Sequence, residues 1–235
     1  MTTVSVTVDV EPDCPPYLWS WRGLEEGMPL LLDLLDGAGI SGTFFTTGES
    51  ARRYPAVVRR IVEGGHELAC HGMTHRAFTD LSLQEAREEV ALSSEILRDH
   101  APVDSFRAPY LRFPDRYLPL LEEYGFRVDS SRGLYKPAHW RPSAPTALTR
   151  IPASMTSSVL RLSPALRDPV LRALHSPVVL FVHPWEFVDL RDTDLRWDCR
   201  WGTGPHALAS LASTIDLFRR RGDVFRTVRE VALHA

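Results

Sequence analysis

Residues 4–10 read VSVTVDV, in which valine alternates with polar residues. This period of two predicts a β-strand rather than a helix. Further along, leucines recur at helical spacing over residues 25–38 before Gly39, and the stretch SGTFFTTG at residues 41–48 predicts a second strand. The beginning of the chain therefore has the order strand, helix, strand.

The same alternation continues along the chain. The other predicted helices lie at residues 49–63, 81–100, 115–124 and 206–221, and the other predicted strands at 66–70, 104–109, 126–131 and 176–183. The helix at 81–100 is the clearest, because Ser82 is followed three residues later by Glu85, as in a capping box. Alternating strands and helices predict parallel strands with helical crossovers, either in an open doubly wound sheet or in a closed barrel.

Length and composition indicate the number of domains and the class of protein. The 235 residues contain no linker, repeat or low-complexity tract, so we expect residues 1–235 to form a single α/β domain. Residues 132–170, rich in proline and serine, form the least regular stretch and are interpreted as a long excursion within that domain. With 44% hydrophobic and 24% charged residues, the chain resembles ordinary globular proteins rather than disordered or fibrous ones.

The net charge and the cysteine content indicate which binding partners and which cellular location to expect. A net charge of −3 gives no reason to expect a nucleic acid or an acidic membrane as partner. Three widely spaced cysteines argue against a disulfide framework and are interpreted as intracellular thiols. The chain starts without a secretory signal pattern and has no apolar run near the ~20 residues of a membrane span, so we expect a cytoplasmic location and no transmembrane segment. Homo-oligomerisation is left open.

Polar side chains that could carry chemistry fall at or just after the carboxyl ends of the predicted strands. They are Asp9 and Glu11 at the first strand, His71 and His75 after the third, and Arg107, Asp129 and His183 at later ones. In parallel α/β proteins these strand ends share one face, and that face carries the active site. We therefore expect five separate segments to converge.

Two pairs among these residues suggest a metal site. His71 and His75 have the four-residue spacing that places two imidazoles on one side of a helical turn, where they could bind Zn²⁺, although such pairs also occur as surface or capping residues. Asp9 and Glu11 lie two apart on a strand, so their side chains share a face, either around a cation or at a solvated strand end. Two histidines and a carboxylate would leave a fourth zinc position for water. The stretch HELACH at 66–71 is not the HExxH of zinc proteases, because its fifth residue is cysteine.

These residues resemble the motifs of the polysaccharide deacetylases, carbohydrate esterase family 4. The matching segments are VSVTVDVE (4–11), TFFTTG (43–48), GGHELACHGMTH (64–75), FRAPY (106–110), VDSS (128–131) and LFVHPWEF (180–187). The resemblance covers most of the chain and implies a distorted (β/α) barrel. The first motif usually has two adjacent aspartates, whereas here it is a spaced Asp-Val-Glu. Together with the HPWE form of the last motif, this departure suggests a side branch of the family.

The resemblance implies the metal ligands and the base. The ligands it implies are Glu11, His71 and His75, with Asp13 as the alternative carboxylate. Asp9 corresponds to the general base, and Arg107 to the residue that orients this base. A base of this kind takes the proton of the attacking water while the metal polarises the amide carbonyl.

The resemblance also implies how the oxyanion, the leaving amine and the acetyl group are held. The backbone N–H of Tyr110 helps hold the oxyanion. His183 acts as general acid, and Asp129 beside it keeps this histidine charged. Phe181 and Trp185 flank His183 and line the pocket for the acetyl methyl. Each residue type also has an ordinary structural role, so the functional interpretation depends on their convergence.

Aromatic residues follow the first predicted strand. Trp19 and Trp21, in YLWSWRGLEEG at residues 17–27, are placed to overhang the site, and aromatic faces suit sugar rings. A lid packed on the barrel mouth explains them equally well. The same two explanations apply to Trp197 and Trp201.

The resulting hypothesis is a metal-dependent hydrolase that removes the N-acetyl group from an N-acetylated sugar or glycan. Zn²⁺ is the expected cofactor, although Co²⁺, Ni²⁺ or Fe²⁺ could occupy a site of this type. Two alternatives keep the same fold. One is a hydrolase of cyclic ureides or imides, and the other is a barrel that binds glycans without hydrolysing them.

Overall fold

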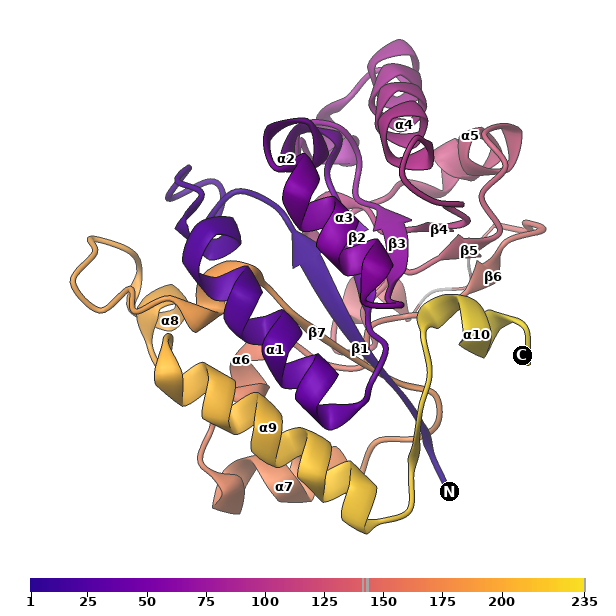
Figure 1. The fold of residues 1–235 in the computed structure, drawn as a ribbon. Helices are drawn as coiled ribbons and strands as arrows, with labels where there is room; N and C mark the ends of the chain where they lie inside the picture. Colours follow the sequence, from indigo (N-terminus) through magenta and orange to yellow (C-terminus); the bar gives the residue numbers. More distant parts are fainter. Residues whose placement is uncertain (141, 143, 235) are drawn as a thin grey trace.

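The chain forms an α/β structure around one curled sheet, which the computed structural model describes for residues 1–140, 142 and 144–234 (Figure 1). Residues 141 and 143, in the predicted irregular stretch 132–170, and residue 235 lie outside the described residues. The strands of the described chain are β1 (Thr3–Val10), β2 (Thr43–Thr46), β3 (Glu67–Cys70), β4 (Ser105–Phe106), β5 (Val128–Asp129), β6 (Thr149–Arg150), β7 (Val178–Val182) and β8 (Val224–Phe225). They are parallel in the order β6-β5-β4-β3-β2-β1-β7, and β8 also pairs with β1.

Helices surround this sheet. They are α1 (Met28–Ala38), α2 (Gly48–Arg53), α3 (Pro55–Glu63), α4 (Leu83–Arg98), α5 (Leu118–Glu123), α6 (Ser157–Leu160), α7 (Pro164–Arg172), α8 (Trp197–Arg200), α9 (Pro205–Arg220) and α10 (Val228–Ala232). Short 3₁₀ turns occur at Phe78–Asp80, Pro109–Leu111, Asp115–Tyr117, Pro137–His139 and Pro184–Phe187, and a π-helical turn at Gly23–Gly27 leads into α1. None of the helices in the described part of the chain is long and apolar enough to cross a bilayer.

The predicted helices are largely confirmed, with one break. Ser82 caps α4 in a capping box with Glu85, as its sequence indicated. The single helix predicted for residues 49–63 is wrong, because it is divided at Tyr54 into α2 and α3. Pro55 explains the division, since the residue before a proline is disfavoured in helical conformation and proline is well placed at the start of a new helix.

The sheet curls into the distorted barrel that the family resemblance implied. Its two outer strands, β6 and β7, are joined just past the end of β6 by Ser154. The backbone N–H of Ser154 donates to the carbonyl of Val179 at 2.9 Å, and the N–H of Val179 donates to the Ser154 hydroxyl at 2.9 Å. The predicted excursion 132–170 therefore supplies both β6 and the contact that closes the sheet.

Helix α10 closes the end of the barrel at which the strands begin. The backbone N–H of Val228 donates to Thr43 Oγ1, and that of Arg229 donates to Glu67 Oε2, both at 2.9 Å. Thr43 and Glu67 are the first residues of β2 and β3. Val231, from α10, packs in the same cluster as residues of the barrel interior. The opposite end, where the strands finish, is left for the functional site.

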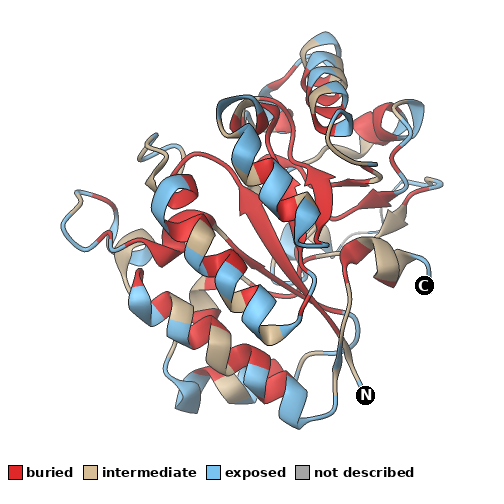
Figure 2. Ribbon diagram, in the orientation of Figure 1, coloured by how far each residue is buried: buried red, intermediate tan, exposed pale blue. Residues whose placement is uncertain are grey.

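The alternation in β1 separates two buried environments. Its valines at positions 4, 6, 8 and 10 pack in one core cluster with residues of α1 and α9. Ser5, Thr7 and Asp9 are buried on the other face, inside the barrel. Figure 2 shows β1 buried along nearly its whole length, with the exposed residues on the outer faces of the helices and in the loops. Burial of each valine contributes roughly 1.5–3 kcal/mol to folding, whereas the polar inner face serves the site.

Candidate metal centre

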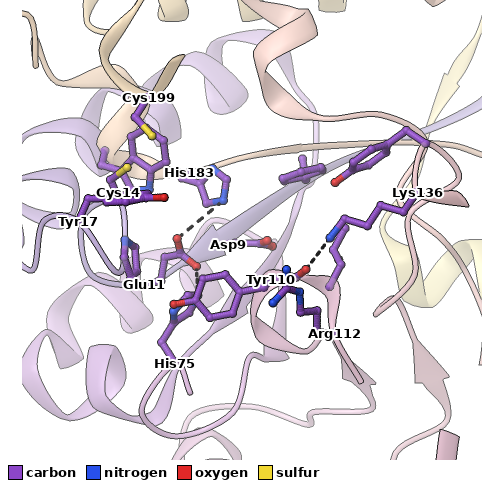
Figure 3. A pocket seen from close by; sticks show the side chains of 15 residues that line it. Asp9, Glu11, Cys14, Tyr17, His75, Tyr110, Arg112, Lys136, His183 and Cys199 are labelled. Carbon is purple, nitrogen blue, oxygen red and sulfur yellow. Dashed lines mark hydrogen bonds and ion pairs between the residues drawn. The ribbon is translucent and has the colours of Figure 1, made fainter. Parts of the chain in front are cut away.

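Side chains from separate strands meet in one cavity of about 350 Å³ at the carboxyl ends of the strands (Figure 3). The predicted site residues that line it are Asp9, Glu11, His75, Tyr110, Phe181, His183 and Trp185. His71 and Arg107 lie directly beneath them, in contact with Glu11 and Asp9 respectively. The predicted convergence of distant segments at this face is therefore found for these residues, whereas Asp129 does not line the cavity.

Glu11, His71 and His75 form a compact group of potential ligands. His75 Nε2 lies 2.6 Å from Glu11 Oε2, and His71 Nε2 lies 3.3 Å from the same oxygen. One ligand atom from each of the three lies within 4.8 Å of the others, and all three residues are buried. A carboxylate oxygen and two imidazole nitrogens are a common three-residue set for a divalent ion with an open fourth position.

The surroundings of the two histidines fit a metal. The Nδ1–H of His71 donates to the carbonyl oxygen of Arg107 at 2.7 Å, which leaves the Nε2 lone pair turned toward Glu11. Burial opposes ionisation of Glu11, but the charges of His75 and His183 and hydrogen bonds from His71 and His75 hold the pKa of Glu11 well below its usual range. An ionised carboxylate among imidazoles is the charge arrangement that a cation needs.

The helical turn predicted for His71 and His75 is wrong. Residues 71–77 are a loop, and His75 has a left-handed backbone conformation with φ of 58°. The Glu89 carboxylate on α4 fixes this loop by accepting hydrogen bonds from the backbone N–H of Met73 at 2.7 Å and of Thr74 at 2.9 Å. The histidines meet because the loop folds back, with their ring centroids 5.3 Å apart.

Asp13, the alternative carboxylate, has other partners. Its Oδ1 accepts from the backbone N–H of Gly23 at 2.9 Å, and its Oδ2 accepts from the Ser20 hydroxyl at 2.6 Å. These bonds anchor the loop between β1 and α1. The carboxylate grouped with the two histidines is that of Glu11.

Asp9 is held by the fully buried Arg107. Arg107 Nη1 donates to Asp9 Oδ1 at 2.6 Å and to Thr7 Oγ1 at 2.8 Å, while Nη2 donates to Ser130 Oγ at 3.0 Å. The guanidinium also lies over the Phe45 ring, 4.1 Å from its centroid. This network fixes the Asp9 carboxylate at the cavity wall, as expected for an oriented base.

His183 faces the ligand group from β7. Its Nε2 lies 3.8 Å from Glu11 Oε1, and its ring stacks on Trp185 with centroids 4.9 Å apart. Its Nδ1–H donates to Glu186 Oε1 at 2.7 Å. Burial lowers the pKa of His183, but the negative charges of Glu11 and Glu186 and the hydrogen bond to Glu186 outweigh it and raise this pKa to about 9. The imidazolium form is therefore favoured at neutral pH.

The predicted pairing of Asp129 with His183 is wrong. Asp129 pairs with Arg150, whose Nε lies 2.6 Å from Asp129 Oδ2, because the two residues are direct neighbours in the β5–β6 register. Burial raises the pKa of Asp129, against the opposing effects of Arg150 and Ser131. The partner of His183 is Glu186, which the sequence analysis did not assign. The sequence feature that could have indicated this partner is the glutamate three residues after His183 in HPWE.

The predicted aromatic contacts divide into two groups. Phe181 and Trp185 line the cavity, and Tyr135, which was not predicted, stacks on Phe181 with centroids 6.5 Å apart. Trp19 is 53% exposed and lines a neighbouring depression. Trp21 is not among the residues lining either space.

Trp21 is partly buried and packs against a hydrophobic core cluster instead. Its ring lies 5.6 Å from that of Tyr54, and the Arg53 guanidinium lies 5.2 Å above it. Trp197 and Trp201 stack on each other at 5.6 Å, and neither lines the cavity. For these three tryptophans, the structure favours packing over direct contact with a ligand in the cavity.

All three cysteines are free thiols, and two of them meet at the cavity. Cys14 and Cys199 both line it and lie on the same side of it in Figure 3. A hydrogen bond between these thiols lowers the pKa of Cys199 to about 7, and raises that of Cys14 together with burial. This side of the cavity thus carries sulfur, whereas the opposite side carries Arg112 and Lys136.

Sequence comparisons relate the first half of the chain to known deacetylases. Residues 2–128 match the family model described as polysaccharide deacetylase. A peptidoglycan deacetylase-like protein from Gibberella zeae is 36% identical over 110 residues, which are 45% of this chain and 32% of that protein. A peptidoglycan-N-acetylglucosamine deacetylase from Bacillus cereus is 29% identical over 128 residues, or 53% of this chain and 42% of that protein. The chain thus matches less than half of the length of these relatives.

Structural comparisons extend the likeness to nearly the whole chain at the level of the fold. A protein from Mycobacterium smegmatis, proposed to be a polysaccharide deacetylase, aligns with a TM-score of 0.75 and 23% identity over 99% of this chain and 89% of that chain. A carbohydrate esterase family 4 pseudoenzyme from Bacillus anthracis aligns with a TM-score of 0.68 and 16% identity over 98% of this chain and 65% of that chain. With its family model, its motifs and its barrel in agreement, the chain belongs to the polysaccharide deacetylase family.

Proposed function

We propose that this protein is a metal-dependent hydrolase that removes the N-acetyl group from an N-acetylated carbohydrate. The observation that carries this proposal is the grouping of Glu11, His71 and His75 with an oriented carboxylate, Asp9, and a histidine, His183. All of these residues line one cavity except His71, which lies directly beneath it. The relative named as a peptidoglycan-N-acetylglucosamine deacetylase and the one named as peptidoglycan deacetylase-like support the substrate class. The proposal applies to residues 1–235 as one functional domain.

Asp9 would act as the general base. A divalent ion held by Glu11, His71 and His75 would polarise the amide carbonyl and make an attacking water more acidic. Asp9 lines the cavity beside these ligands and would take the proton of that water. Arg107 keeps the Asp9 carboxylate aimed, because its bonds to Thr7 and Ser130 fix its own position.

His183 would act as the general acid. Cleavage of an amide requires a proton for the departing amine, and the negative charge of Glu186 and its hydrogen bond with His183 Nδ1–H favour the protonated form of His183. The backbone N–H of Tyr110 would stabilise the oxyanion, and Phe181 and Trp185 would enclose the acetyl methyl. Zn²⁺ is the cofactor that we propose, since two imidazoles and one carboxylate suit it, with Co²⁺, Ni²⁺ and Fe²⁺ as other divalent ions of similar preference.

An acetate-release screen over N-acetylated sugars, with and without a chelator, tests this function. We expect release from at least one sugar, loss of release after chelation and recovery when zinc or cobalt is returned. Because one structural neighbour is described as a pseudoenzyme, the fold alone does not decide activity. Sugar binding without acetate release in the metal-loaded protein would favour a glycan-binding barrel. Ring opening of a cyclic ureide or imide would favour the other alternative.

Glu186 is expected to position His183, and its replacement should lower kcat more than it changes KM. We predict a loss of about 10- to 100-fold in kcat for Glu186→Ala, because the ring of the acid is no longer fixed. Glu186→Gln should retain part of the activity, since an amide oxygen can still accept the Nδ1–H. In both variants the alkaline limb of the kcat profile should move to lower pH, because the loss of the negative charge lowers the pKa of the His183 acid.

A matched control is Glu88→Gln, which changes an exposed glutamate on α4. We expect it to leave both kcat and the pH profile unchanged. Glu186→Ala with a wild-type kcat and an unshifted pH profile would contradict this role for Glu186. The pH profiles are measured by acetate release at saturating sugar.

A further inference from the structure

A groove beside the metal cavity carries positive charge without matching negative charge. We call it the cationic groove, defined by Arg112, Phe113, Arg116, Tyr135, Lys136 and His139. None of the described residues that line it is acidic. This concentration stands out in a chain whose net charge is −3. Clustered cations with no acidic partner are expected where an anion binds.

Two of these cations also line the metal cavity itself. Arg112 and Lys136 face both the cavity and the groove, and Figure 3 shows them together on the side away from Cys14 and Cys199. Lys136 Nζ donates to the carbonyl oxygen of Tyr110 at 2.6 Å, which holds the ammonium at the junction of the two spaces. A ligand in the metal cavity would therefore have these cations as its direct neighbours.

Two carboxylates lie near the groove without lining it: Asp80 lines the neighbouring depression that Arg112 shares, and Asp115 has other partners. Asp115, which follows Phe113 by two residues, lies 3.5 Å from Arg150 Nη1 and accepts a hydrogen bond from the backbone N–H of Ala144 at 2.9 Å. Arg116 lies over the Tyr117 ring at 4.6 Å and donates to its hydroxyl. Arg112 forms no ion pair with any residue that the structure describes. Among the described residues, no carboxylate thus forms an ion pair with Arg112, Arg116 or Lys136.

The positive charges in the groove repel one another, which makes each charged form less favourable. Burial, and then the charge of Arg112, lower the pKa of Lys136. Burial, Lys136 and Arg132 lower the pKa of His139. Keeping a half-buried ammonium beside a guanidinium costs free energy in the absence of a ligand, and a bound anion would remove this cost.

From this arrangement we infer that the cationic groove binds an anionic substituent, a phosphate or a carboxylate, carried by the substrate carbohydrate. The inference rests on the proposed function, because it takes the N-acetyl group to lie at Glu11, His71 and His75. The negative charges within the cavity do not oppose it, since Asp9 is paired with Arg107 and Glu11 lies among histidines. The neighbouring Tyr135 offers a ring against which the attached sugar can pack.

The test compares neutral and anionic sugars of similar size. The probes are N-acetylglucosamine, its 1-phosphate, its 6-phosphate and N-acetylmuramic acid, which carries a carboxylate. Dissociation constants are measured by calorimetry at low and high salt, and kcat/KM by acetate release. We expect at least one anionic sugar to bind about tenfold or more tightly than the neutral sugar at low salt, with a smaller advantage at high salt. The preferred probe identifies which anion the groove accepts.

Two variants locate the effect. Arg112→Gln, and Arg112→Gln combined with Lys136→Met, should reduce stepwise the ratio of the affinity for the anionic sugar to the affinity for N-acetylglucosamine. The ratio is the relevant quantity because both side chains also line the metal cavity, where either sugar would lie. Arg87→Gln is the matched control, because it removes one positive charge that is paired with Glu123 outside the cavity and the groove. This control should keep the full advantage.

The proposal is overturned if no anionic sugar binds more tightly than the neutral one, or if the double variant keeps the advantage. Binding and turnover separate it from the proposed function. Tighter binding of an anionic sugar without acetate release from any sugar would leave the groove in place and reject the hydrolase. Acetate release with equal preference for neutral and anionic sugars would retain the hydrolase and reject the groove.

Discussion

Asp9→Asn is expected to lower kcat for acetate release by about 10²- to 10⁴-fold, the range in which a general base contributes. Asparagine has nearly the same shape and can still accept the hydrogen bond from Arg107, but its amide cannot take a proton from water. The ligand group of Glu11, His71 and His75 is unchanged, so the metal content should stay at the wild-type level. Both quantities are measured on the same preparation, by acetate release and by elemental analysis.

Asp33→Asn provides the control for this substitution. Asp33 lies on α1 and pairs with Arg60 at the surface. Neither residue lines the cavity. Its replacement should leave kcat unchanged. A wild-type kcat in Asp9→Asn would show that another group takes the proton, and loss of metal in this variant would mean that Asp9 is a ligand rather than the base.

Arg107→Met should have the largest effect on stability. We predict a loss of about 3–5 kcal/mol in the free energy of unfolding, because the substitution leaves the buried Asp9 carboxylate without its cation. The bonds to Thr7 and Ser130 are lost at the same time. Urea denaturation followed by fluorescence measures the change, with an unchanged m-value expected if the denatured state is unaffected.

A double variant separates the charge from the packing. In Arg107→Met combined with Asp9→Asn, no unpaired charge remains, so about 1 kcal/mol or more of the lost stability should return relative to Arg107→Met alone. If the double variant is as unstable as the sum of the two single variants, the cost arises from packing and not from an isolated Asp9 charge. Arg107 would then be a structural residue with no particular relation to the base.

The sequence predicted the framework of the fold because β1 has a clear period. Alternation from Val4 to Val10 defines both buried faces, and the polar face delivers Asp9 and Glu11. The choice between an open sheet and a barrel was not readable from this period. That choice depends on the long-range contact between Ser154 and Val179, which joins segments with no local signal.

Short elements were missed for a related reason. The strands β6 and β8 have two residues each, too few to show any alternation. The five-residue helix α10 depends on Glu67 and Thr43, which satisfy its first N–H groups from distant strands. Such elements form because tertiary contacts support them, and local propensity does not identify them.

The positions of site residues at strand ends were predictable from the sequence, whereas the contacts made by residues in loops were less so. Asp9, Glu11, Arg107 and His183 lie at the ends of strands and converge as expected. The partner of His183 depends on the 3₁₀ turn after β7. This turn places the carboxylate of Glu186, three residues further on, against His183 Nδ1. Arg112 and Lys136 lie far apart in the sequence and both line the cationic groove, so their proximity is visible only in the three-dimensional structure.

The central claim is that Glu11, His71 and His75 hold one divalent ion between Asp9 and His183. Anomalous X-ray scattering at the zinc edge, from crystals grown with Zn²⁺, tests it most directly. The account predicts one strong peak at roughly 2.0–2.2 Å from Glu11 Oε2 and from Nε2 of both histidines. A map in which the two imidazoles point away from Glu11, or in which zinc scatters only at other residues, would contradict it.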